Sequence, residues 1–153
     1  MAGRLSPIHD VTPQFMAHAS LTLETTGPGF VEFTREAARF LAEAGAGEGV
    51  LFAYLRHTSA SLVIQENADP DVQTDLVTAL ERIAPANVGW VHTTEGPDDM
   101  PAHVKTMVTG VSLHVPVLGG KLALGTWQGL YLAEHRRTAH CREILLQFIG
   151  SRR

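Results

Sequence analysis

The stretch that decides the fold is Gly49–Pro70, GVLFAYLRHTSASLVIQENADP, in which a short polar break separates two apolar runs. Gly49–Arg56 is almost wholly apolar and indicates a buried strand. His57-Thr58-Ser59 interrupts this run, and Ser61–Gln65 predicts a second strand. Asp69-Pro70 is typical of a helix start, with the aspartate as N-cap and the proline in the first turn. We therefore expect two strands and then a helix at the centre of the fold.

Periodicity and turn signals on both sides of this centre extend the pattern to the rest of the chain. The other expected strands are Ala19–Thr25, Gly89–His92, Ser112–Val117, Leu122–Trp127, Gly129–Glu134 and Glu143–Ile149. Expected helices cover 30–44, the segment after Asp69 with a buried stripe of Val72, Leu76, Leu80 and Ile83, and the segment from Asp99 to Gly110. Strands outnumber helices, which predicts a single compact α+β domain with a largely antiparallel sheet and about three helices. We place this domain at 17–153, after an irregular lead at 1–16.

Composition narrows the classes of protein to which this chain can belong. Its 153 residues are 44% hydrophobic and carry a formal net charge of −4, which favours a folded core and disfavours a nucleic-acid-binding surface. The single cysteine, Cys141, excludes an internal disulfide and a cysteine-based metal cluster within one chain. The first residues lack the apolar segment of a signal peptide, and no apolar run is long enough to span a bilayer. We expect a cytoplasmic protein whose partner is neither a nucleic acid nor a membrane.

Polar residues break the pattern in three places, and the first runs from His57 to Asp69. An imidazole and two hydroxyls follow the buried strand there, at the end of the expected sheet. Glu66 and Asn67 then crowd the start of the next helix, where backbone N–H groups favour anions. Helix capping alone explains Asp69, but capping requires neither His57 nor Glu66.

The second place is His92–His103, HTTEGPDDMPAH, which holds two histidines and three acidic residues. If Asp99 caps a helix, His103 lies one turn further along and faces roughly the same way. Histidine and carboxylate together suit a divalent metal ion such as zinc or manganese, and they also suit acid–base catalysis. A solvated acidic loop with two incidental histidines is the alternative, and the spacing does not separate these interpretations.

The third place is Gly125–Arg136, which begins with Gly125-Thr126-Trp127-Gln128-Gly129. The two glycines indicate a bulge or a close backbone approach. Trp127 fits a core position, whereas Gln128 in the middle of a strand does not. Arg136 is suited to holding a carboxylate or phosphate through two parallel hydrogen bonds, or else forms a surface pair with Glu134.

Together these segments resemble the secondary thiamine-phosphate synthase family, also called the YjbQ family. The motifs that carry the resemblance are His57-Thr58-Ser59-Ala60-Ser61-Leu62, Glu66-Asn67-Ala68-Asp69-Pro70, Glu95-Gly96-Pro97-Asp98-Asp99-Met100-Pro101-Ala102-His103 and Gly125-Thr126-Trp127-Gln128-Gly129. They occur in the family's order and at matching separations, from about Ser20 to Gly150. The main departure is Gln65, because the family usually has asparagine at that position.

The resemblance implies a compact α+β fold, a homotrimer with polar clefts near the subunit interfaces, and a bound metal. It also implies a weak thiamine-phosphate synthase activity, which joins a pyrimidine diphosphate to a thiazole phosphate and releases pyrophosphate. The physiological reaction of the family is left open by its name, since the activity is called secondary.

Residues and resemblance together give one hypothesis for one pocket. A divalent metal ion, zinc or magnesium or manganese, is expected on His57, His92 and His103, with Glu95 or Asp99 as helpers. The expected catalytic residues are His57, Glu66, Asn67, Asp69, Asp99 and Gln128. The expected substrate-binding residues are Thr58, Ser59, Thr126, Trp127 and Arg136. His57 cannot be both a metal ligand and a free base, so those two roles exclude each other.

The expected partner of this pocket is a small phosphorylated metabolite. Two alternatives from another class stay open beside the enzyme. One is a non-catalytic binder of a phosphorylated small molecule, and the other is a metal-binding protein without turnover.

Overall fold

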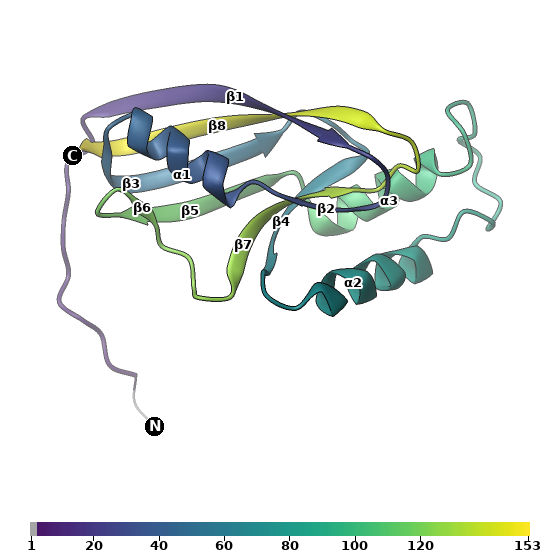
Figure 1. The fold of residues 1–153 in the computed structure, drawn as a ribbon, viewed down its shortest axis with the longest axis horizontal. Helices are drawn as coiled ribbons and strands as arrows, with labels where there is room; N and C mark the ends of the chain where they lie inside the picture. Colours follow the sequence, from purple (N-terminus) through teal and green to yellow (C-terminus); the bar gives the residue numbers. More distant parts are fainter. Residues whose placement is uncertain (1–2) are drawn as a thin grey trace.

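The computed structural model describes residues 3–153, which form two antiparallel sheets and three helices (Figure 1). In chain order the elements are β1 (Phe15–Thr25), β2 (Gly29–Glu32), α1 (Thr34–Glu43), β3 (Ala46–Leu55), β4 (Ala60–Glu66), α2 (Pro70–Ile83), α3 (Asp99–Thr109), β5 (Ser112–Leu118), β6 (Lys121–Leu122), β7 (Gln128–Glu134) and β8 (His140–Arg152). The expected α+β class with antiparallel pairing and three helices is confirmed. No helix among residues 3–153 is long and apolar enough to cross a bilayer.

The strands are divided between a large and a small sheet. The five-stranded sheet has the order β1-β8-β3-β5-β6, and the three-stranded sheet has the order β2-β7-β4. Strand β8 is long because it pairs with β1 on one side and with β3 on the other. In the small sheet β4 pairs with β7 from Ala60↔Glu134 to Glu66↔Gln128. The expected strand Ser61–Gln65 is therefore confirmed, and it is longer by one residue at each end, Ala60 and Glu66.

The core lies between the inner faces of the two sheets and α1, which crosses the large sheet (Figure 1). Side-chain alternation sets which residues enter it: Leu51 and Leu55 of β3 are buried, whereas Phe52 and Tyr54 between them are 41% and 51% exposed. This alternation is the period of two that an extended strand imposes. The large sheet consequently presents apolar side chains on its outer face as well.

Two expected elements begin or end elsewhere than periodicity indicates. The helix expected from residue 30 begins only at Thr34, because Gly29–Glu32 pairs with β7 as a strand instead. The strand expected at Leu122–Trp127 ends at Leu122, because Gly125 and Gln128 close a turn through Gln128 N–H to Gly125 O, 3.0 Å. In both cases hydrogen bonds to β7 or within the turn outweigh the local pattern.

The segment between α2 and α3 also differs from expectation. Gly89–His92 is irregular rather than a strand, and the indole N–H of Trp90 donates to the carbonyl of Pro85 at 2.9 Å. Helix α2 has no fully buried residue, and Ile83 of its expected buried stripe is 55% exposed. Helix α2 therefore contributes less to the core than its sequence indicates.

The start of the chain runs along the surface and away from the body of the molecule (Figure 1). Residues 3–14 are exposed, and β1 begins at Phe15, two residues before the expected start of the domain. Gln14 closes this lead onto β8, because its N–H donates to Gly150 O at 2.8 Å.

Candidate metal centre

Two histidines and an aspartate meet where α3 begins. Asp99 and His103 are four residues apart on α3 and therefore lie on the same face of the helix. His92 reaches them from the preceding irregular segment. Nε2 of His92 lies 2.6 Å from Asp99 Oδ2, and Nε2 of His103 lies 3.1 Å from the same oxygen. All three ligand atoms are within 4.8 Å of one another, so small movements would bring them around one cation.

The ring of His103 is oriented by the main chain. Its Nδ1 lies 2.8 Å from the carbonyl oxygen of Thr58, and only a protonated Nδ1 can donate to a carbonyl. The proton on Nδ1 leaves Nε2 on the side of Asp99, where a metal ligand is needed. A backbone carbonyl behind a ligating histidine is the usual way in which proteins fix the ring and its tautomer. Thr58, expected to bind substrate, thus serves the site through its main chain.

Asp99 is held from the opposite side by Arg136. Nη1 of Arg136 donates to Asp99 Oδ1 at 2.6 Å, which leaves Oδ2 facing the two histidines. Asp99 is 1% exposed, and burial alone would raise its pKa. Hydrogen bonding to His92 and the charges of His103 and Arg136 outweigh burial, so the pKa of Asp99 lies below its usual value. The carboxylate is therefore ionised at neutral pH, as a metal ligand must be.

Arg136 is occupied within the protein. Besides Asp99, its Nε donates to Asp98 Oδ2 at 3.0 Å and its Nη2 to the carbonyl of Glu95 at 2.8 Å. The Asp98 carboxylate also accepts from the backbone N–H of Arg137 at 2.9 Å. Arg136 was expected to hold substrate phosphate, but every nitrogen of its guanidinium already has a protein partner. In this geometry Arg136 positions the ligands of the candidate centre.

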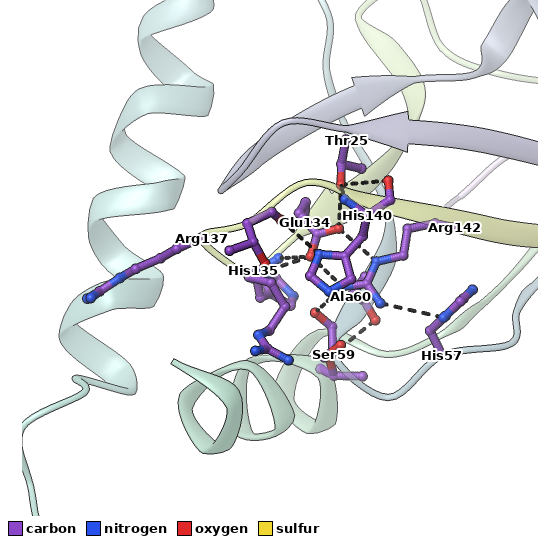
Figure 2. Close-up of polar contacts among 12 residues, drawn as sticks. Thr25, His57, Ser59, Ala60, Glu134, His135, Arg137, His140 and Arg142 are labelled. Carbon is purple, nitrogen blue, oxygen red and sulfur yellow. Dashed lines mark hydrogen bonds and ion pairs between the residues drawn. The ribbon is translucent and has the colours of Figure 1, made fainter. Parts of the chain in front are cut away.

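His57 lies in a different cluster, which Figure 2 shows. Its Nε2 accepts a hydrogen bond from the N–H of Glu143 at 2.9 Å, and its Nδ1 lies 3.5 Å from Arg142 Nη1. Burial and then the charge of Arg142 lower the pKa of His57. His57 is not a member of the group formed by His92, Asp99 and His103.

The centre of that cluster is a buried ion pair that the sequence did not reveal. Arg142 and Glu134 are 3% and 2% exposed, and Arg142 Nε donates to Glu134 Oε2 at 2.7 Å (Figure 2). Thr25 adds a hydroxyl donor to the same oxygen at 2.8 Å, and Arg142 Nη2 also donates to the carbonyl of Ser59 at 3.3 Å. The alternation of side chains along β8 would have indicated that Arg142 is buried, because it points to the same face of the sheet as buried Ile144.

The remaining predicted site residues lie together at the other end of β4 and β7. They are Glu66, Asn67, Asp69, Thr126, Trp127 and Gln128. Asn67 joins the two motifs, since its N–H donates to Trp127 O at 3.1 Å and its Nδ2 to Gln128 O at 3.4 Å. Six steps along β4, each of about 3.3 Å, separate this end from Ala60 by roughly 20 Å. The residues of the expected single pocket thus fall into three groups within one chain: the candidate metal centre, the cluster of His57 and the distal cluster.

Local structure accounts for the polar groups of this distal cluster. Glu66 Oε2 accepts from the N–H groups of Ala68 and Asp69 at 3.1 and 2.9 Å. Asp69 Oδ1 accepts from Asp71 N–H at 2.9 Å, so the expected N-cap is confirmed. A Cβ at Gly129 would lie 2.8 Å from the ring of Tyr131 and 2.9 Å from Glu32 Oε1, so the close neighbours of that glycine are side chains and not the backbone that was expected there.

Comparison with known proteins gives one consistent family. Residues 19–151 match the family described as UPF0047 protein YjbQ-like. A UPF0047 protein of Synechocystis is 43% identical over 131 residues, covering 85% of this chain and 89% of the relative. The UPF0047 protein YjbQ of Escherichia coli O157:H7 is 41% identical over 132 residues, covering 86% and 96%. The crystal structure of a hypothetical protein from Aeropyrum pernix K1 superposes with a TM-score of 0.82 at 27% identity, covering 88% of this chain and 99% of the other.

Proposed function

The chain belongs to the UPF0047 family of YjbQ-like proteins, and from its histidine–aspartate group we propose that it is a divalent-metal-dependent enzyme acting on a small phosphorylated metabolite. The observation that carries this proposal is the arrangement of His92, Asp99 and His103 around one point. Two imidazoles and a carboxylate with further positions open are a ligand set of catalytic zinc and of other divalent transition metals.

The atoms behind the three ligands support a metal more than a chance cluster. His103 is oriented by the Thr58 carbonyl, and Asp99 by the Arg136 guanidinium. A solvated acidic loop would need neither partner, and its aspartate would not be 1% exposed. Ligands of a tetrahedral zinc ion lie roughly 3.3 Å apart, given metal–ligand bonds of about 2.0 Å. The 3.1 Å from His103 Nε2 to Asp99 Oδ2 is close to that spacing, whereas the 2.6 Å from His92 Nε2 is a hydrogen-bond distance that would lengthen around an ion.

The reaction that we propose to test first is the condensation of a pyrimidine diphosphate with a thiazole phosphate. In this reaction the C–O bond to the diphosphate breaks, and its electron pair leaves with pyrophosphate. The thiazole nitrogen supplies the pair for the new C–N bond, so this step needs no general base. A divalent cation would supply stabilisation of the negative charge on phosphate oxygens.

The roles of the other residues follow from their partners. His57 and Glu66, expected to transfer protons, already accept backbone hydrogen bonds, and a condensation without a base does not require them. Arg136 acts as a positioning residue. The guanidinium of Arg136 is occupied by protein partners, so a cation held by His92, Asp99 and His103 would supply the positive charge for phosphate.

The test is metal analysis of the purified protein by mass spectrometry, followed by a turnover assay. We expect about one divalent ion per chain of the wild type. In His103→Ala the metal affinity should fall at least 10–100-fold, the loss that mutation of a residue behind a ligand already causes. His114→Ala is the matched control, since His114 is an exposed histidine in β5, and its metal content should equal that of the wild type. Equal metal content in His103→Ala would refute the centre. Metal and phosphate binding without turnover would leave a non-catalytic binder.

We also propose that the chain assembles as a homotrimer. Support comes from the outer face of the large sheet, where Phe52, Tyr54 and Ile149 are 41%, 51% and 37% exposed. Neighbouring apolar side chains on one exposed sheet face are typical of an interface. Light scattering on the eluting protein should give three times the chain mass of 16.6 kDa.

A further inference from the structure

An open hollow of about 570 Å³ lies beside the candidate metal centre. It is lined by Trp90, Val91, His92, Thr94 and Met100. Its volume falls in the range of small-molecule sites, about 300–1,000 Å³. His92 belongs both to this wall and to the metal-binding group, so a molecule in the hollow adjoins the centre.

The wall of the hollow is apolar and contains a fixed aromatic ring. The indole N–H of Trp90 donates to Pro85 O at 2.9 Å, which fixes the ring and satisfies its polar group within the loop. The ring is then available for contacts that need no hydrogen bond. Val91 is 99% exposed beside it, although an isolated apolar side chain gains nothing from such a position. Ring and valine together present an apolar surface to a ligand.

Charged side chains surround the metal-binding group that shares His92 with the hollow. Among the residues described, the lining of the hollow includes no acidic side chain, lysine or arginine. The carboxylates nearby are those of Glu95, Asp98 and Asp99, and Arg136 compensates part of their charge. A ligand that fits has an uncharged flat part in the hollow and an anionic part at the cation.

We propose that the hollow is a subsite for the aromatic ring of a phosphorylated substrate, with Trp90 as its stacking platform. This proposal rests on the proposed function, because the phosphate of the same ligand binds at the metal centre. The ligand class is a phosphate ester of a flat aromatic or heteroaromatic ring.

The test compares phenyl phosphate with ethyl phosphate by calorimetry on the metal-loaded protein. The two probes share the phosphate head and differ in the ring. We expect phenyl phosphate to bind about fivefold more tightly or better, since stacking on an aromatic side chain contributes at least that factor. Trp90→Ala should remove this preference and leave the affinity for ethyl phosphate unchanged. Trp90→Phe should retain most of it.

Two further variants show whether an effect of Trp90→Ala arises from loss of the ring or from misfolding. Val88→Asn is the matched control, because it changes a valine of the same segment that is 55% exposed and outside the lining of the hollow, and it should keep the full preference. Val91→Asn changes a side chain on which folding does not depend and should reduce the preference by a smaller factor than Trp90→Ala.

Three results would overturn the proposal. Equal affinities of the two probes for the wild type refute the ring subsite, while metal-dependent binding of ethyl phosphate would still support the proposed function. Binding of neither probe to the metal-loaded protein refutes both proposals. A change in solution mass caused by Trp90→Ala would identify the hollow as a contact between copies of the chain instead of a ligand site.

Discussion

Two buried carboxylate–arginine pairs of this protein, Glu134–Arg142 and Asp99–Arg136, are completed differently. Glu134 receives donors on both oxygens, from Arg142, from Thr25 and from backbone N–H groups. Asp99 receives Arg136 on one oxygen and turns the other to His92 and His103. The first pair is closed, and the second is open toward a cation. A carboxylate held on both oxygens by arginine, hydroxyl and backbone donors stabilises a fold, whereas one whose second oxygen faces two histidines is available for chemistry.

The environment of each pair accounts for a lowered carboxyl pKa. Burial raises the pKa of Glu134, but hydrogen bonds from Arg142, the backbone of Arg136 and Thr25 lower it further than burial raises it. The pKa of Asp99 is lowered despite burial by His92, His103 and Arg136. The direction is therefore common to both pairs, and only the geometry of the donors separates a structural role from a functional one.

Removing one member of the closed pair should have the largest effect on stability. Arg142→Met leaves Glu134 buried without its cation, and such a loss costs roughly 3–5 kcal/mol of unfolding free energy. Urea denaturation measures it. Arg39→Met is the matched control, since Arg39 pairs with Glu43 at 3.7 Å on the exposed face of α1 and should change stability by less than about 0.5 kcal/mol. Equal effects of the two variants would contradict the distinction between buried and exposed pairs.

The residue between Glu134 and Arg136 gives a pH-dependent prediction of intermediate size. Burial and the charge of Lys105 lower the pKa of His135 from 6.5 to about 4, and its Nε2 lies 2.7 Å from Ser61 Oγ. A folded-state pKa below the unfolded value means that stability is complete above pH 6.5 and falls as the unfolded chain takes up the proton. We expect a loss of roughly 2 kcal/mol between pH 7 and pH 5.

Denaturation curves at several pH values check this dependence. His135→Gln should flatten it, because glutamine keeps a hydrogen-bonding group but does not titrate. His114→Gln, at an exposed position of β5, should leave it as in the wild type. A wild-type stability that is constant from pH 7 to pH 5 would contradict the burial of a neutral His135.

The smallest of these effects should come from loosening the open pair. Arg136→Lys keeps the charge but cannot contact Asp98, Asp99 and the Glu95 carbonyl together, so Asp99 loses its fixed orientation. We expect metal affinity to fall about tenfold, as for other residues that orient ligands, with the metal Kd measured by competition with a chelator. Arg137→Lys changes the neighbouring exposed arginine and should have no effect. Unchanged affinity in Arg136→Lys would show that Asp99 does not need this partner.

Much of the fold is predictable from the sequence because its signals are local. Asp69-Pro70 starts a helix as expected, since the cap lies within two residues of its acceptor. The apolar run at Gly49–Arg56 is a strand in the large sheet. The start of α1 was predicted too early, at residue 30, because the deciding signal is not local. Phe30 belongs to β2 through its pairing with Ala133, a residue about one hundred positions away.

The candidate site was predictable only in part. The four-residue spacing of Asp99 and His103 placed them on one helix face, which the structure bears out, although the N-cap is Asp98 and Asp99 is the first helical residue. The expected ligand set of His57, His92 and His103 wrongly included His57, because which histidines reach the helix depends on the path of irregular segments, and no periodicity reports that. The sequence also indicates why there is no single pocket, because the His57 and Glu66 motifs lie at opposite ends of one strand. A strand of that length separates its ends by roughly 20 Å.

The carbonyl of Thr58 that orients His103 has a consequence for how this chain can change over generations. Every amino acid carries the same carbonyl, so this part of the site is encoded by the path of the backbone and not by the identity of a side chain. Substitutions at position 58 that preserve this path leave the histidine tautomer intact. Mutational drift at that position is therefore free to alter what surrounds the candidate centre without altering how His103 is held.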